Sequence, residues 1–177
     1  ALVYLGYDDS SKDPKELQEA EDLLHEARPY IKKFTSSTLL NDLANGDVCI
    51  AMSWAGDYAT ASARAREAGK DIDLRYFVPE EGGLLWVDII VIPKDAKNIE
   101  NAYLLLDYLL RPEVSADFVN LTHYASPVPE AKAFIKEEVL NDTAVYPTPE
   151  IMDRLFFTEV DPPKYTRIKT RIFSRFK

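Results

Sequence analysis

Cysteine, histidine and long apolar runs are scarce in this chain of 177 residues. A single cysteine, Cys49, allows no internal disulfide, although a cysteine outside these residues could pair with it. Cys49 and two histidines far apart in the sequence, His25 and His123, argue against a zinc site, so we expect no metal. No apolar run reaches the roughly 20 residues that span a bilayer, so we expect no membrane span.

A start signal is also lacking. The first residue is alanine, and no signal peptide precedes the opening Ala1-Leu2-Val3-Tyr4-Leu5-Gly6. This opening is typical of the last turn of a helix that is closed by glycine. We therefore expect these residues to be part of a longer protein.

Basic residues are outnumbered, 21 against 30 acids, for a formal net charge of −9. This balance disfavours nucleic acid as a partner and favours cationic ligands. Residues 164–177 are the exception, because they carry bases and no acid. Apolar residues recur there at helical spacing, which predicts an amphipathic helix with a basic outer face rather than an anion-binding arm.

Helical and strand-like segments alternate along the chain. Apolar spacing and caps predict helices over 13–30, 36–44, 57–68, 99–110 and 112–120, and apolar runs predict strands over 47–53, 74–78 and 84–92. The alternation predicts an α/β fold in which helices cover both faces of a sheet. Strand 47–53 has little polar alternation, so we expect it to be buried, with Cys49 as a packed thiol.

Two aspartates stand close to tryptophans at strand-like segments. Asp57 ends the sequence Ser53-Trp54-Ala55-Gly56-Asp57, and Asp88 follows Trp86 inside the apolar run 84–92. A carboxylate is costly to remove from water without a cation or donors, and an indole can face a cation. Ligands of α/β sheets collect at the carboxyl ends of strands, where Trp54 and Asp57 would lie. The pattern suggests a site for an organic ammonium ion.

Each of these residues also has a purely structural interpretation. Asp57 can cap the helix that it opens, and a tryptophan such as Trp54 is more often a core residue. Asp88 can bond to a helix terminus or an arginine. Tyr124, which follows a helix in a predicted loop, is unremarkable by itself.

Motifs for nucleotide, lipase-type or zinc-protease sites are absent. Several segments in order do resemble one family: Asn41 to Ala51, Trp54-Ala55-Gly56-Asp57, Pro79-Glu80-Glu81-Gly82-Gly83, Trp86-Val87-Asp88, Ile92 to Asn98 and Tyr108 to Val114. They resemble the polyamine-binding proteins of bacterial ABC importers, most of all the putrescine-binding branch. The resemblance runs across essentially the whole chain.

The resemblance implies a periplasmic solute-binding protein of type II, with two α/β lobes that close over a diamine. It implies no enzyme activity and no cofactor, a polyamine ligand, and an ABC transporter permease as partner. Trp54 with Asp57, Trp86 with Asp88, and Tyr124 match ligand contacts of the family. The ligand choice is mixed, because Asp57 is similar to the putrescine branch whereas Gly82-Gly83 with Trp86-Val87-Asp88 resembles the spermidine branch.

The resemblance also implies that the N-terminal half of the family fold lies outside these residues. Residues 1–83 and 124–177 would then build one lobe, and residues 84–123 would cross a hinge into the other. Two alternative functions stay open. One is an enzyme that uses a carboxylate pair, as a glycosidase does. The other is a sensor or interaction module that has the same fold but no role in transport.

Overall fold

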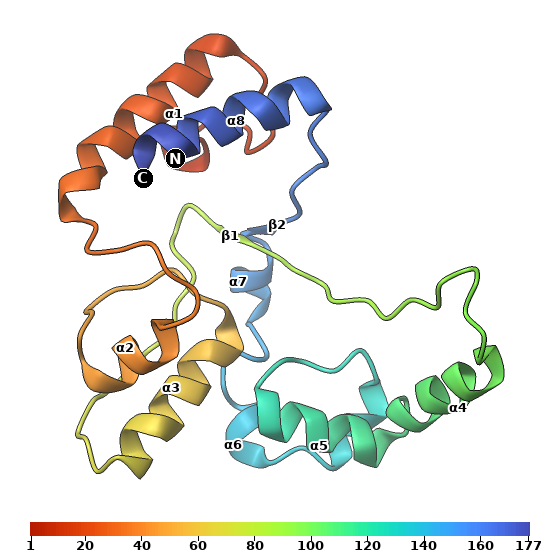
Figure 1. Ribbon diagram of the computed structural model, residues 1–177. Coiled ribbons are helices and arrows are strands. Elements are labelled where there is room, and N and C mark those ends of the chain that lie inside the picture. Colours follow the sequence, from red (N-terminus) through yellow and green to blue (C-terminus); the bar gives the residue numbers. More distant parts are fainter. The chain divides into compact units, whose positions relative to one another are not determined.

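The computed structural model describes all 177 residues, and they form two compact units. Unit 1 consists of residues 1–37, 78–86 and 153–177, and unit 2 of residues 38–77 and 87–152. Each unit therefore combines segments that lie far apart in the sequence, as the colours of Figure 1 show. The predicted crossings between two lobes, after residues 83 and 123, refer to a protein with both lobes present, and they stay a prediction.

Unit 1 is built on two long helices, α1 (Pro14–Ala27) and α8 (Pro163–Phe176), which pack side by side (Figure 1). Helix α1 begins as predicted, with Asp13 accepting a hydrogen bond from the Lys15 N–H at 2.7 Å and Pro14 in the first turn. Single 3-10 turns lie at Val3–Leu5 (η1) and Arg28–Tyr30 (η2).

The contact between α1 and α8 combines aromatic packing with a shielded ion pair. Phe176, the buried residue of α8, meets Phe34 edge to face at 5.2 Å between ring centroids. Glu21 of α1 is 6% exposed and accepts two hydrogen bonds from Arg175, at 2.5 and 2.7 Å. These bonds lower the pKa of Glu21, against the opposing effect of burial. One base of the predicted basic face thus holds α8 to α1.

Two short parallel strands complete unit 1. Strand β1 (Gly83–Leu84) pairs with β2 (Leu155–Phe156), and Gly83 lies opposite Leu155. Gly82 precedes β1 with φ of 114°, and a Cβ at this position would lie 2.5 Å from the Arg154 carbonyl oxygen. A side chain is therefore excluded both by the backbone conformation and by the neighbouring strand.

Unit 2 is mainly helical. Its helices are α2 (Leu39–Asn45), α3 (Ala55–Glu67), α4 (Ile99–Leu109), α5 (Pro112–Thr122), the 3-10 helix η3 (Pro129–Ala133), α6 (Glu137–Leu140) and α7 (Pro149–Met152). Helices α2 and α3 pack on each other, and α5 packs on η3. The buried core under α5 consists of Ala116, Val119, Ala131, Ile135, Val139 and Val145.

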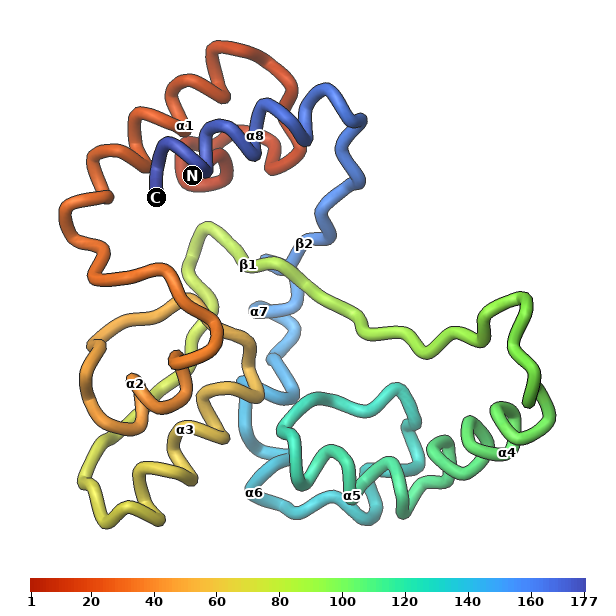
Figure 2. Tube along the Cα trace, viewed as in Figure 1, coloured from red at the N-terminus to blue at the C-terminus, as the bar shows by residue number.

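The predicted helices are present, but the predicted strands are not paired. Segments 47–53, 74–78 and 85–92 form no ladder, and the sheet is limited to β1 and β2. Residues 71–78 still alternate between exposed and part-buried side chains, which is the signature of a strand. The chain runs from β1 into α4 without forming a helix, as the green part of the tube in Figure 2 shows. A strand needs a neighbour along its length for its backbone groups. The Leu85 N–H donates to the Phe156 carbonyl oxygen at 2.8 Å, but the ladder does not continue into the segment that follows.

The predicted burial of segment 47–53 is wrong for the same reason. Met52 is fully exposed and Ile50 is 86% exposed. Cys49 is an exposed thiol rather than a packed one. The mixed α/β class is confirmed, while the sheet within these residues is smaller than predicted.

Candidate functional site

The predicted site residue Asp57 lies in the first turn of α3, in unit 2. Its Oδ2 accepts hydrogen bonds from the Ser53 hydroxyl at 2.8 Å and from the Trp54 N–H at 3.4 Å. The carboxylate therefore satisfies backbone at the helix start, and the positive end of the helix dipole favours its charge. The structural interpretation of Asp57 is thus correct in part. Both bonds end on one oxygen, so Oδ1 can accept from a ligand.

Trp54 is the residue immediately before α3, and its indole is not part of the core. The backbone is extended there, with φ of −82° and ψ of 153°, and the residue is 49% exposed. The structural expectation of a packed tryptophan is therefore wrong. A half-exposed tryptophan three residues before a carboxylate is accessible to a cation from solvent.

Tyr124 reaches the start of α3 because α5 ends in an unusual way. His123 ends α5 with a left-handed backbone conformation, φ of 57°. The chain therefore leaves the helix axis immediately before Tyr124. A Cβ on Gly56 would lie 2.5 Å from the Tyr124 ring and 2.5 Å from the Thr122 carbonyl oxygen. The absence of a side chain at Gly56 thus lets the tyrosine ring lie against the first turn of α3.

Both predicted carboxylates, Asp57 and Asp88, affect the pKa of Tyr124. Burial raises the pKa of Tyr124, and so do the charges of Asp57 and Asp88, while a backbone hydrogen bond with Gly56 acts in the opposite direction. Tyr124 is 43% exposed, so its ring is accessible as well. The charges of Asp57 and Asp88 therefore both reach Tyr124 in unit 2, and Trp54 stands at the start of the helix that carries Asp57.

Asp88 itself is exposed, which corrects the premise for singling it out. The run 84–92 is not a buried strand, because Ile89 and Ile90 are 77% and 67% exposed. Trp86 is 61% exposed and belongs to unit 1, whereas the other four candidates belong to unit 2. The part of Trp86 in the site stays a prediction.

Three residues near this site, Tyr58, Tyr76 and Asp142, were not predicted from the sequence. Tyr58 follows Asp57 on α3 and donates a hydrogen bond to Asp142, and its ring stacks on Tyr76. Tyr76 is among the groups whose charge raises the pKa of Tyr124. Only the alternation of residues 71–78 hints that Tyr76 points inward, and no sequence signal connects Tyr58 with a residue 84 positions away.

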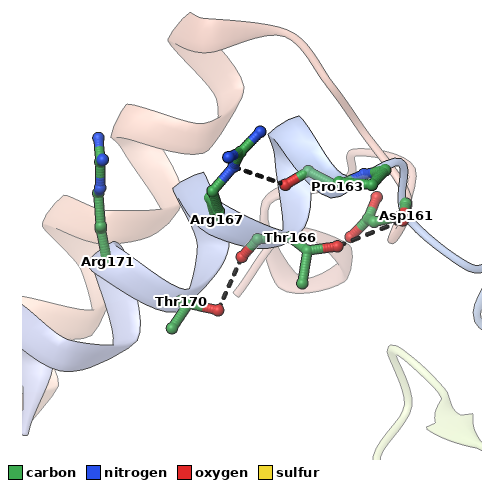
Figure 3. A pocket seen from close by; sticks show the side chains of 6 residues that line it. All are labelled: Asp161, Pro163, Thr166, Arg167, Thr170 and Arg171. Atoms are coloured by element: carbon green, nitrogen blue, oxygen red, sulfur yellow. Dashed lines mark hydrogen bonds between the residues drawn. The ribbon is translucent and has the colours of Figure 1, made fainter.

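Unit 1 has a hollow of its own, at the start of α8. It is lined by Asp161, Pro163, Thr166, Arg167, Thr170 and Arg171 at the start of α8 (Figure 3). The Arg167 Nε donates to the Pro163 carbonyl and the Thr170 hydroxyl donates to the Thr166 carbonyl, so these groups serve the helix backbone. The hollow contains none of the predicted site residues.

The arrangement in unit 2 suits a positively charged ligand, and comparison with known proteins gives its context. Residues 1–148 match the family described as bacterial extracellular solute-binding protein. The chain belongs to this family. No helix of this solute-binding protein combines the length and the apolar character needed to cross a membrane.

Relatives with assigned names are polyamine-binding proteins. The solute-binding protein is 37% identical over its whole length to a putrescine-binding periplasmic protein of Pseudomonas aeruginosa, of which it covers 48%. It is 40% identical to a putrescine-binding periplasmic protein of Escherichia coli, with 99% of this chain and 48% of the relative aligned. Identity to the spermidine/putrescine-binding periplasmic protein of E. coli is 37% over 150 residues. The chain thus spans about half the length of the relatives that it matches.

A solved structure shows the same fold. A spermidine/putrescine ABC transporter substrate-binding protein of Streptococcus pneumoniae superimposes with a TM-score of 0.85 at 32% identity, over 99% of this chain and 52% of the other. The fold is therefore that of a periplasmic-binding-protein-like half, as predicted.

Proposed function

We propose that the protein containing this chain binds putrescine or a related polyamine as the solute-binding component of an ABC uptake system. The observation that carries the proposal is the neighbourhood of Asp57, Asp88 and Tyr124 in unit 2, with the exposed Trp54 beside it. The names of the relatives support the ligand class.

The chemistry of a diamine fits this set of side chains. Its two ammonium ends lose strong hydration on binding, and carboxylates such as Asp57 and Asp88 replace it with charge-assisted hydrogen bonds. The aromatic faces of Trp54 and Tyr124 cover the methylene chain and add a cation–π attraction of about 0.5–2 kcal/mol each. The predicted contact of Trp86 would add a further indole. Neither acid needs a metal or a cofactor for this role.

Uptake would proceed by closure of two lobes around the ligand. The closed form is stabilised by contacts that the open form lacks, and a membrane permease recognises it. Binding proteins of this family work outside the cytoplasmic membrane, and the names of the relatives favour the periplasm. The permease partner and the periplasmic location are parts of the proposal.

The second lobe has a candidate surface in unit 2. Helix α4 is rich in leucine and tyrosine yet has no buried residue, and Leu104 is 66% exposed. The segment before α4 is similar, because Ile89 and Ile90 are also exposed. A soluble protein rarely leaves so much contiguous apolar surface uncovered. We infer that the half of the family fold outside these residues covers this surface, in line with the expected crossing at residues 84–123.

Substitution of the acids tests the function. We expect Asp57→Ala and Asp88→Ala in the full-length gene product to weaken putrescine binding by more than about tenfold, since each leaves an ammonium end without its counter-charge. Isothermal titration calorimetry measures the affinities. Asp117→Ala, which removes an exposed acid from α5, is the matched control and should bind as the wild type does. Unchanged affinity of both site variants would remove these residues from the site.

The alternative functions make different predictions. A carboxylate-pair enzyme would release a product from a glycoside or alter putrescine on incubation, and mass spectrometry of the mixture would detect either product. A sensor without transport would bind the ligand, but its gene would lie apart from genes for a permease and an ATPase. The relatives' names describe binding proteins and favour neither alternative.

A further inference from the structure

The hydroxyl of Tyr58 links two parts of unit 2 that carry different residues of the proposed site. Tyr58 follows Asp57 on α3, and its Oη donates a hydrogen bond to Asp142 Oδ2 at 2.7 Å. Burial and this bond raise the pKa of Tyr58 to about 12, so the hydroxyl remains a proton donor at neutral pH.

Asp142 is itself held firmly by the turn after α6. Its Oδ1 accepts from the Ala144 N–H at 2.9 Å, and its carbonyl accepts from Val145 and Tyr146. Val145 belongs to the buried cluster under α5, together with Val119. Helix α5 ends at His123 and leads directly into Tyr124. Asp142 and Tyr124 thus both lie next to segments that pack in the same buried cluster, the one under α5.

The ring of Tyr58 is fixed on its other side by Tyr76. The two rings stack with centroids 6.0 Å apart and an angle of 29° between planes. Both side chains are part-buried, and neither is one of the residues expected to contact ligand. Tyr58 is therefore held by its face and by its hydroxyl, immediately next to Asp57 in the sequence.

We propose that the Tyr58–Asp142 hydrogen bond sets the spacing between Asp57 on α3 and Tyr124 after α5, and thereby selects the length of the bound diamine. The inference rests on the proposed function and deepens it. The Gly56–Tyr124 contact brings α3 and the end of α5 together at one point, and the Tyr58–Asp142 bond adds a second. Two points of contact fix the orientation of α3 as well as its distance. Because the Tyr124 ring covers the methylene chain next to the ammonium end at Asp57, a ring held at a fixed distance leaves no room for the additional methylene of a longer diamine.

The variant Tyr58→Phe tests this role, because it keeps the ring and its stacking and removes only the donor. The full-length gene product is titrated calorimetrically with putrescine and with cadaverine, which is one methylene longer. We expect putrescine affinity to fall by roughly threefold to tenfold, less than for loss of a hydrogen bond to the ligand itself, because the Tyr58–Asp142 bond acts on the ligand only through the position of α3. We also expect the preference between the two diamines to shrink by at least about threefold. Tyr30→Phe, at a tyrosine that is 89% exposed in unit 1, is the control and should change neither quantity.

The outcomes separate positioning from simple stabilisation. A lower melting temperature with an unchanged ratio of the two affinities would show that the bond is merely structural and would overturn the inference. Should Tyr58→Phe fail to fold, Asp142→Ser replaces it, since its hydroxyl can still accept from the Ala144 N–H but the shorter side chain no longer reaches the Tyr58 hydroxyl. The same change in ratio is expected, and an unchanged ratio overturns the inference again. If the wild type binds neither diamine, the proposed function fails first; if it binds and the ratio is insensitive, only this inference fails.

Discussion

Gly56 offers the sharpest test of how the site is assembled. Replacement by alanine would place a Cβ 2.5 Å from the Thr122 carbonyl oxygen and 2.5 and 2.7 Å from two atoms of the Tyr124 ring. Ordinary contacts between carbon atoms are about 3.5–4.0 Å, so one partner must move by about 1 Å. The Thr122 oxygen belongs to the backbone and cannot rotate away, so the start of α3 and the end of α5 must separate, and the tyrosine ring must shift as well.

We expect Gly56→Ala to lower the free energy of unfolding by about 1–3 kcal/mol, as overpacked sites do. Part of this loss is offset, because alanine favours a helix over glycine by roughly 0.5–1 kcal/mol. Displacement of Tyr124 should also weaken diamine binding, by about tenfold if one aromatic contact worth about 1 kcal/mol is lost together with its packing. Urea unfolding and calorimetric titration of the full-length gene product measure the two effects.

Gly69→Ala is the matched control for this prediction. Gly69 has φ of 66° and no atom within 4 Å of the position that a Cβ would take. Alanine there suffers backbone strain of roughly 1–2 kcal/mol but no clash, so stability should fall while affinity stays unchanged. The reasoning is refuted if Gly56→Ala binds putrescine as tightly as Gly69→Ala does.

Two further predictions concern unit 1 and the apolar surface. Arg175→Ala removes both hydrogen bonds to Glu21 and should lower the melting temperature at neutral pH. Because the folded-state pKa of Glu21 is lowered from 4.5, its contribution is present above that pH and is lost as the pH falls through the lowered value. The wild type should therefore progressively lose its advantage over Arg175→Ala as the pH falls below 4.5, and equal melting temperatures at pH 7 would contradict this. If the rest of the family fold covers α4, amide hydrogen exchange of Ile99–Leu109 should be much slower in the full-length gene product than in these 177 residues alone, and equal exchange rates would place the second lobe elsewhere.

Helices were the most predictable part of the fold. Helix α1 begins after Asp13 and α8 packs through Phe176, because caps and apolar spacing act within a few residues. Strands were less predictable, since a strand requires a partner that often lies far away in the sequence. The run around Ile90 has the composition of a buried strand and is nevertheless exposed. The site shows the same contrast, because Trp54 and Asp57 are only three positions apart in the sequence, whereas the effect of the Asp57 and Asp88 charges on Tyr124 depends on the folded chain.

The sequence by itself determined the helices, the excess of acids and the pairing of Trp54 with Asp57, because these depend on neighbouring residues or on composition. Only the tertiary structure decided that the charges of Asp57 and Asp88 both reach Tyr124 and that Tyr58 is bonded to Asp142. The physical reason is that a close approach such as that of Tyr124 to Gly56 depends on how two helices pack, and packing is set by the shape of side chains distant in the sequence.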